Sequence, residues 1–148
     1  MDNKTILLIE DNTDDIDLTL RAFKKNNLRN EIFIIKDGGE ALDYVDKLCE
    51  LPKSEANKLP AVILLDLKLP KVDGIEILKK IRSTPTTKFI PVVILTSSVE
   101  EQDLFNGYKF GANSYIRKPV DFQKFLSAVQ QLGLYWLLLN ETPQDMVI

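Results

Sequence analysis

The chain has 148 residues, 45% of them hydrophobic, and a formal net charge of −3. This length and composition suit a single globular domain over residues 1–148, and no glycine-, serine- or proline-rich linker divides it. The negative charge disfavours nucleic acid and acidic membranes as partners, because their phosphate groups are bound by clustered lysine and arginine. The lack of histidine excludes histidine catalysis, histidine-containing triads and the usual zinc sites.

Short apolar runs alternate with amphipathic stretches along the chain. The runs are rich in β-branched residues and predict strands at residues 6–9, 32–35, 61–65, 92–95 and 114–116. Apolar residues at helical spacing lie between the strands, and a fifth helix is expected from about Asp121. Strands that are apolar on both faces are typical of a parallel sheet covered on two sides. The sequence therefore predicts an α/β domain of five strand–helix units.

Local signals refine this prediction. Ser98, followed three residues later by Glu101, predicts a capping box for the fourth helix, and Gly111 is placed to end that helix in a left-handed conformation. Residues 51–60 contain two prolines and predict a long loop. The single cysteine, Cys49, falls at a core-facing helical position and cannot form an internal disulfide. Because the amino terminus also lacks a signal peptide, we expect a cytoplasmic protein.

Charged or hydroxyl-bearing residues follow four of the predicted strands, namely Glu10, Asp11, Asp66, Thr96 and Lys118. The carboxyl ends of parallel strands share one edge of a sheet, so we expect these side chains to converge. Three ionised carboxylates repel one another by about 4 kcal/mol per pair at 4 Å and an effective dielectric of 20, so the acidic trio needs a cation. Oxygen ligands without histidine suit Mg²⁺.

The same cluster could handle a phosphoryl group. A divalent ion beside a carboxylate, with the ammonium of Lys118 and the hydroxyl of Thr96, would stabilise phosphoryl oxygens while Asp66 acts as the nucleophile and forms an aspartyl-phosphate. Each residue alone has an ordinary explanation. An acidic pair after a strand is usually a solvated turn or a helix cap, and a single lysine is usually surface charge. The joint placement at successive strand ends favours the functional interpretation.

At these positions the chain resembles the receiver domains of two-component response regulators, over nearly its whole length. The matching stretches are residues 6–12, residues 63–70 with Asp73 and Gly74, residues 93–97 and residues 111–119. The resemblance implies a flavodoxin-like (βα)5 doubly wound parallel sheet with strand order 2-1-3-4-5. It also implies that the chain is a signalling domain and not an enzyme. The only reactions expected of such a domain are its own phosphorylation and autodephosphorylation.

The resemblance also assigns roles to individual residues. It implies that Asp66 accepts a phosphoryl group from a sensor histidine kinase and that Lys118 contacts this group. The peptide bond between Lys118 and Pro119 would be cis and would orient the lysine. Thr96 and Tyr115 would form the switch pair, in which the hydroxyl turns toward the phosphate and the ring moves inward. The implied Mg²⁺ ligands are Glu10, through water, with Asp11, Asp66 and the backbone carbonyl of Lys68.

Within the family, the chain is similar to single-domain regulators that serve bacterial phytochrome-type kinases. The similar stretches are residues 96–98, 113–116, 118–122 and 131–136. This similarity implies no output domain, an extended C-terminal helix, and a signal that leaves through an unknown downstream protein. Residues 134–139 are apolar on every helical face, so they either pack under the domain's own loops or form a homodimer contact.

Two other functions remain open at this point. A haloacid-dehalogenase-type phosphatase also uses a strand-end aspartate and Mg²⁺, but it needs a second acid two residues on, where this chain has Lys68. A phosphate-independent binding module on the same fold would be expected to lack Asp11, Asp66 or Lys118, and all three are present.

Overall fold

A computed structural model describes residues 4–118 and 121–132. Its sheet consists of β1 (Ile6–Ile9), β2 (Ile32–Ile35), β3 (Val62–Leu65), β4 (Val92–Thr96) and β5 (Ser114–Arg117). Neighbouring strands all pair in parallel, in the order β2-β1-β3-β4-β5. The predicted doubly wound, flavodoxin-like fold and its strand order are therefore confirmed.

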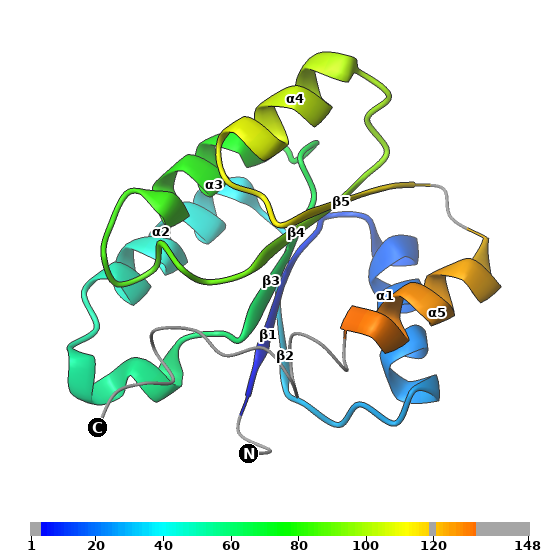
Figure 1. Cartoon of the computed structure of the whole chain (residues 1–148), viewed down its shortest axis with the longest axis horizontal. Helices are drawn as coiled ribbons and strands as arrows, with labels where there is room; N and C mark the ends of the chain where they lie inside the picture. The colour runs from blue at the N-terminus through cyan, green and yellow to red at the C-terminus, as the bar shows by residue number, and fades with distance from the viewer. Residues whose placement is uncertain (1–3, 119–120, 133–148) are drawn as a thin grey trace.

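Helices cover both faces of this sheet. They are α1 (Thr13–Lys25), α2 (Gly38–Cys49), α3 (Gly74–Arg82), α4 (Glu101–Lys109) and α5 (Phe122–Leu132). Figure 1 shows α2, α3 and α4 on one face and α1 and α5 on the other. Alternate strand residues supply the two cores, with Leu7 and Ile63 facing α2 and α3, and Leu8 and Leu64 facing α1 and α5. Burial on both faces explains why the strands are apolar throughout.

Several predicted boundaries need correction. Strand β3 begins one residue later than predicted, at Val62, and β5 ends one residue later, at Arg117. Thr96 is the last residue of β4 rather than the residue after it, so its side chain is held by the sheet. The predicted loop at residues 51–60 contains a 3₁₀ helix, η1 (Lys53–Lys58). Cys49, the last residue of α2, is half-buried against the core, and its sulfur accepts a hydrogen bond from the Thr84 hydroxyl at 3.1 Å.

The predicted capping box of Ser98 and Glu101 is wrong. Helix α4 begins at Glu101 with Glu100 as its N-cap, and the Glu100 side chain makes no capping hydrogen bond. The Ser98 hydroxyl instead donates to the Asp103 carboxylate at 2.5 Å, because a buried charged acceptor makes a stronger hydrogen bond than a neutral partner. At the other end of α4, Gly111 has a φ of 103°, as its predicted left-handed conformation requires.

The start of α3 lies against the loop that follows β3. A Cβ atom on Gly74 would stand 2.5 Å from the backbone oxygen of Asp66 and 2.6 Å from the Cα atom of Leu67, so only glycine fits here. The Asp73 side chain caps the same helix by accepting a hydrogen bond from the Ile75 N–H at 3.0 Å. Helix α3 therefore fixes the backbone that carries Asp66.

Some predictions fall on residues outside the described ranges. They are the extended C-terminal helix beyond Leu132, the apolar contact of residues 134–139 and the cis peptide before Pro119. Among the helices of residues 4–118 and 121–132, none has the length and hydrophobicity needed to span a bilayer.

Candidate functional site

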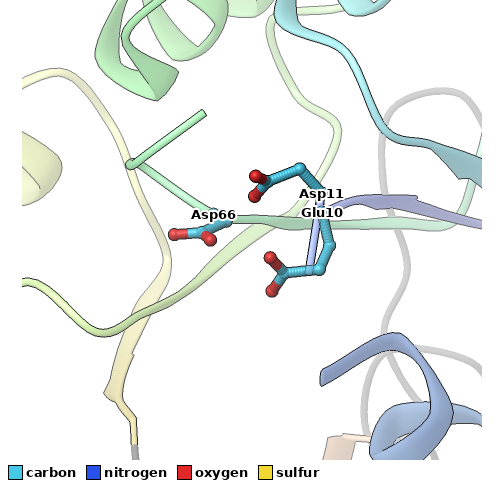
Figure 2. Close-up of side chains that lie close together, drawn as sticks. All are labelled: Glu10, Asp11 and Asp66. Carbon is cyan, nitrogen blue, oxygen red and sulfur yellow. The ribbon is translucent and has the colours of Figure 1, made fainter. Parts of the chain in front are cut away.

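Three carboxylates meet at the carboxyl ends of two adjacent strands. Glu10 and Asp11 follow β1, and Asp66 follows β3, which pairs with β1 so that Ile9 lies beside Leu65. One oxygen atom of each carboxylate lies within 4.8 Å of the others (Figure 2). Glu10 and Asp66 are buried, whereas Asp11 is exposed. The structure thus brings the predicted acidic trio together.

The ammonium of Lys118 reaches this cluster from the end of β5. Its Nζ atom lies 2.7 Å from Glu10 Oε1, 2.7 Å from Asp15 Oδ2 and 3.5 Å from Asp66 Oδ2. Burial lowers the pKa of Lys118, but the hydrogen bonds to Asp15 and Glu10 and the charge of Asp66 outweigh it, so the pKa is raised. Lys118 is therefore a fixed positive charge among several carboxylates.

Asp15 is a site residue that the sequence interpretation missed. It lies in the first turn of α1, where its backbone N–H donates to the capping Asn12 side chain at 3.0 Å. Its carboxylate, however, faces Lys118 across the site. The sequence held no signal for this contact, because an acid in the first turn of a helix is ordinary and Lys118 is far away in the chain.

Burial and crowding alter the acidity of Glu10. The residue is 1% exposed, and the pKa of its carboxyl is raised from 4.5 to about 7, first by burial and then by the neighbouring Asp66. Lys118 opposes this shift without cancelling it. The site therefore resists having all its carboxylates ionised, as expected for negative charges brought together out of water.

Asp66 and Lys68 are joined through the backbone. Asp66 Oδ1 accepts a hydrogen bond from the Lys68 N–H at 3.1 Å, while the Lys68 side chain turns toward α4 and places its Nζ 3.1 Å from Asp103 Oδ2. Both residues border an open, polar pocket of about 460 Å³. Its lining residues are Asp11, Asn12, Thr13, Asp14, Asp15, Asp66, Lys68, Ser97 and Lys118. The pocket leaves room for a small anion beside Asp66.

The predicted switch residues lie on the neighbouring strands. Thr96 is fully buried, and its Oγ1 accepts a hydrogen bond from the Ser98 N–H at 3.3 Å. The Tyr115 ring is half-buried beside Tyr108, with 6.3 Å between the ring centroids. The Tyr115 hydroxyl is buried and has no hydrogen-bond partner within residues 4–118 and 121–132. Neither side chain contributes to the acidic cluster itself, and their switch role stays a prediction.

The donor set fits a hard divalent cation. The cluster offers carboxylate oxygens without nitrogen or sulfur ligands, which is the chemistry that Mg²⁺ and Mn²⁺ prefer. Because Glu10 and Asp66 are buried, water does not screen the repulsion between their carboxylates. A bound cation would relieve that repulsion. The contribution of the Lys68 carbonyl stays a prediction.

The sequence profile of the family described as response regulator receiver domain matches residues 6–130. The chain belongs to this family. Receiver domains bind a divalent metal and receive their signal from a histidine kinase, and the acidic cluster of this chain offers carboxylate ligands that suit such a metal.

Two relatives of known sequence cover nearly the whole receiver domain. The probable methanogenesis regulatory protein FilR2 of Methanothrix harundinacea is 40% identical over 138 residues, which are 93% of this chain and 86% of the relative. The response regulator Rcp1 of Synechocystis is 37% identical over 134 residues, 90% of this chain and 89% of Rcp1.

Solved structures show the same fold. The phosphorylated cyanobacterial phytochrome response regulator RcpA is 38% identical and superposes with a TM-score of 0.79, covering 95% of this chain and 98% of RcpA. The Mn²⁺-bound form of Rcp1 is 35% identical with a TM-score of 0.78, covering 95% and 99%. Phosphorylation and a bound divalent ion are thus both recorded among close structural relatives.

The raised pKa of Glu10 predicts how stability depends on pH in metal-free buffer. Between pH 4.5 and about 7 the folded protein keeps a proton that the unfolded chain has released, so stability should fall as the pH rises through this window. The slope should be at most about 1.4 kcal/mol per pH unit. Urea denaturation between about pH 5 and pH 8 measures it. Glu10→Gln should flatten the slope, and equal slopes in both proteins would contradict the burial argument.

Proposed function

We propose that Asp66 accepts a phosphoryl group from a sensor histidine kinase, and that the phosphorylated receiver signals by binding another protein. The observation that carries this proposal is the environment of Asp66. Its carboxylate is 5% exposed, opens onto the polar pocket, and lies 3.5 Å from the Lys118 ammonium and beside Glu10 and Asp11. A nucleophile, a fixed cation and a place for a divalent ion are the parts that phosphoryl transfer to a carboxylate needs.

The two oxygens of Asp66 are not equivalent. Oδ1 accepts the Lys68 N–H, which holds the carboxylate plane, whereas Oδ2 faces Lys118. We assign the attack to Oδ2. It forms a bond to phosphorus as the phosphorus–nitrogen bond of the kinase phosphohistidine breaks, and the electron pair returns to the imidazole nitrogen, which takes a proton from solvent. The product is an aspartyl-phosphate with three oxygens in the pocket.

Lys118 stabilises those oxygens. Before phosphorylation its ammonium is shared among Glu10, Asp15 and Asp66, so it can move by a short distance to a phosphoryl oxygen while keeping one carboxylate partner. Mg²⁺ bound by Asp11 and Asp66, and through water by Glu10, would neutralise the remaining phosphoryl charge.

The new charge is the signal. A phosphoryl group adds about −1.5 to −2 charge and three acceptor oxygens. If Thr96 turns its hydroxyl toward them, it gives up the 3.3 Å hydrogen bond from the Ser98 N–H and so disturbs the loop before α4. Tyr115, on the adjacent strand, would follow. To move the population from 1:99 to 99:1, the phosphoryl group must favour the active form by about 5.5 kcal/mol.

The relatives suggest the input. RcpA is a cyanobacterial phytochrome response regulator, and Rcp1 is a response regulator of Synechocystis. We therefore propose a phytochrome-type histidine kinase as the donor of the phosphoryl group, and light as the stimulus. We further propose that the protein acts as a single-domain, cytoplasmic signalling protein and not as an enzyme on other substrates. The alternatives are a phosphatase and a phosphate-independent binding module, and phosphorylation assays separate the three.

The first test is Asp66→Asn, which keeps the shape of the side chain but removes its nucleophilicity. Incubation with acetyl phosphate and Mg²⁺, followed by intact mass, should show an adduct in the wild type and none in the variant. Asp43→Asn, which removes an exposed charge on α2, should keep the adduct. Label transfer from a phytochrome histidine kinase then tests the input. An undiminished adduct on Asp66→Asn would move the acceptor elsewhere, and continuous release of phosphate without an adduct would favour a phosphatase.

The second test concerns the cation. Mg²⁺ should raise the melting temperature of the unphosphorylated protein, because it binds only where the folded chain gathers Glu10, Asp11 and Asp66. Asp11→Ala should raise stability in metal-free buffer by removing a repelling charge, and it should reduce the response to Mg²⁺. Asp43→Ala is the matched control and should leave that response intact. A wild-type melting temperature that ignores Mg²⁺ would contradict the proposed site.

The third test concerns assembly. We propose a homodimer through the apolar residues 134–139, which lie outside the described residues. Trp136→Glu would place an unpaired charge in that contact and should shift the protein to monomer in sedimentation velocity while leaving phosphorylation intact. Phe89→Glu, at an exposed aromatic before β4, should leave the dimer unchanged. A monomeric wild type would end the proposal, and unfolding of Trp136→Glu would place Trp136 in the domain's own core.

A further inference from the structure

A buried carboxylate on α4 connects two loops of the phosphoryl site. Asp103 is 8% exposed, and its Oδ2 atom accepts the Ser98 hydroxyl at 2.5 Å and lies 3.1 Å from Lys68 Nζ. Ser98 in turn donates its backbone N–H to Thr96 at 3.3 Å. Polar contacts therefore run from Lys68, beside Asp66, through α4 to Thr96.

The position of the Lys68 ammonium is the part of this network that bears on the chemistry. Its backbone N–H orients Asp66, and its side chain borders the pocket. The ion pairs that Lys68 makes within the described part of the chain are with Asp103 and, at 3.9 Å, with Glu100. Asp103 thus keeps the ammonium on the α4 side of the pocket rather than over Asp66.

Helix capping alone does not explain Asp103. An acid in the first turn of a helix interacts favourably with the helix dipole, and an exposed ion pair contributes little. Asp103 is nearly buried, however, and a buried charge is costly unless it is paired and hydrogen-bonded. It also acts beyond α4, because the pKa of the Tyr115 hydroxyl is raised first by burial and then by the charge of Asp103.

We propose that Asp103 is a positioning residue that holds the Lys68 ammonium out of the phosphoryl pocket and thereby sets how long the phosphoryl group on Asp66 lasts. This inference rests on the proposed function. Loss of the phosphoryl group requires a water oxygen to attack phosphorus as the phosphorus–oxygen bond to Asp66 breaks. The electron pair returns to the carboxylate, and a water proton passes to the departing phosphate. In-line attack comes from the side of the pocket opposite Asp66.

A released Lys68 would obstruct that approach. Without Asp103, the carboxylate left beside the ammonium is that of Glu100, which is exposed and 3.9 Å away, and an exposed ion pair contributes little. The phosphoryl oxygens, which add negative charge in the pocket, then become the stronger acceptors. Bound there, the long side chain would occupy the space that the attacking water needs. Neutralising Asp103 should therefore lengthen the phosphoryl lifetime when the Lys68 ammonium is present, and should have no such effect when the ammonium has been removed.

The experiment compares four proteins, the wild type, Asp103→Asn, Lys68→Met and the double variant. Each is phosphorylated with acetyl phosphate and Mg²⁺, desalted, and followed by intact mass. Asp103→Asn keeps an acceptor for Ser98, and its half-life should be about threefold longer or more, the size of coupling expected between contacting residues. The double variant should agree with Lys68→Met within about twofold, because Asp103 has no ammonium left to position. Glu100→Gln, at the exposed second partner of Lys68, is the matched control and should behave as the wild type.

The outcomes separate the possible failures. Equal half-lives in Asp103→Asn and the wild type would overturn the positioning role and leave Asp66 as acceptor. A lengthening that persists in the double variant would also overturn it, because Asp103 would then act through α4 and not through Lys68. If Asp103→Asn does not fold, Asp103→Ala takes its place, and unfolding of both would make Asp103 purely structural. Failure of the wild type to take up a phosphoryl group would instead refute the proposed function.

Discussion

The ion pairs of Lys118 hold the functional edge of this domain together. One ammonium from the end of β5 contacts Glu10 after β1 and Asp15 in α1, and lies near Asp66 after β3. Without it, the carboxylates would face one another across a buried site, and removing one partner of a buried ion pair typically costs about 3–5 kcal/mol. The sheet order makes the contact possible, because β1, β3, β4 and β5 are successive neighbours whose carboxyl ends lie along one edge. The strand order therefore brings Lys118 to the carboxylates, and Lys118 in turn offsets the repulsion that this strand order creates among them.

This dependence explains why the sequence predicted the fold and most of the acidic cluster. Strands that are apolar on both faces predict a parallel sheet covered by helices on both sides. In such a sheet the carboxyl ends of the strands share one edge, which brings Glu10, Asp66 and Lys118 together. Asp15 escaped because an acid in the first turn of a helix is ordinary by itself. Its role depends on Lys118, 103 residues away in the chain, and only the folded structure brings the two together.

The errors near α4 have a similar cause. Serine followed by glutamate at the right spacing predicts a capping box, but Ser98 lies in a buried place where Asp103 competes for its hydroxyl. The tertiary contact with Asp103 overrides the local capping pattern, and the sequence alone does not reveal that contact. The states of Thr96 and Tyr115 were beyond prediction for the same reason, because residue type shows that a hydroxyl is present and not which partner it has. The Tyr115 hydroxyl is buried without a partner in the described part of the chain, which costs about 1–3 kcal/mol.

That cost, and the polar attachment of α4, indicate which element can respond to phosphorylation. Helix α3 is anchored by apolar burial, through Ile75, Ile77, Leu78 and Ile81. The buried residues of α4 are Asp103 and Gly107, and its aromatic residues Phe105 and Tyr108 are exposed. Hydrophobic burial does not respond to a new charge nearby, whereas a carboxylate paired with Lys68 and Ser98 does. An added phosphoryl group would therefore act on the polar contacts that Asp103 makes at the start of α4, and a shift there would bring the Tyr115 hydroxyl near new partners. The exposed apolar surface of α4 would move with it, which is how a charge placed on Asp66 can change the surface that another protein meets.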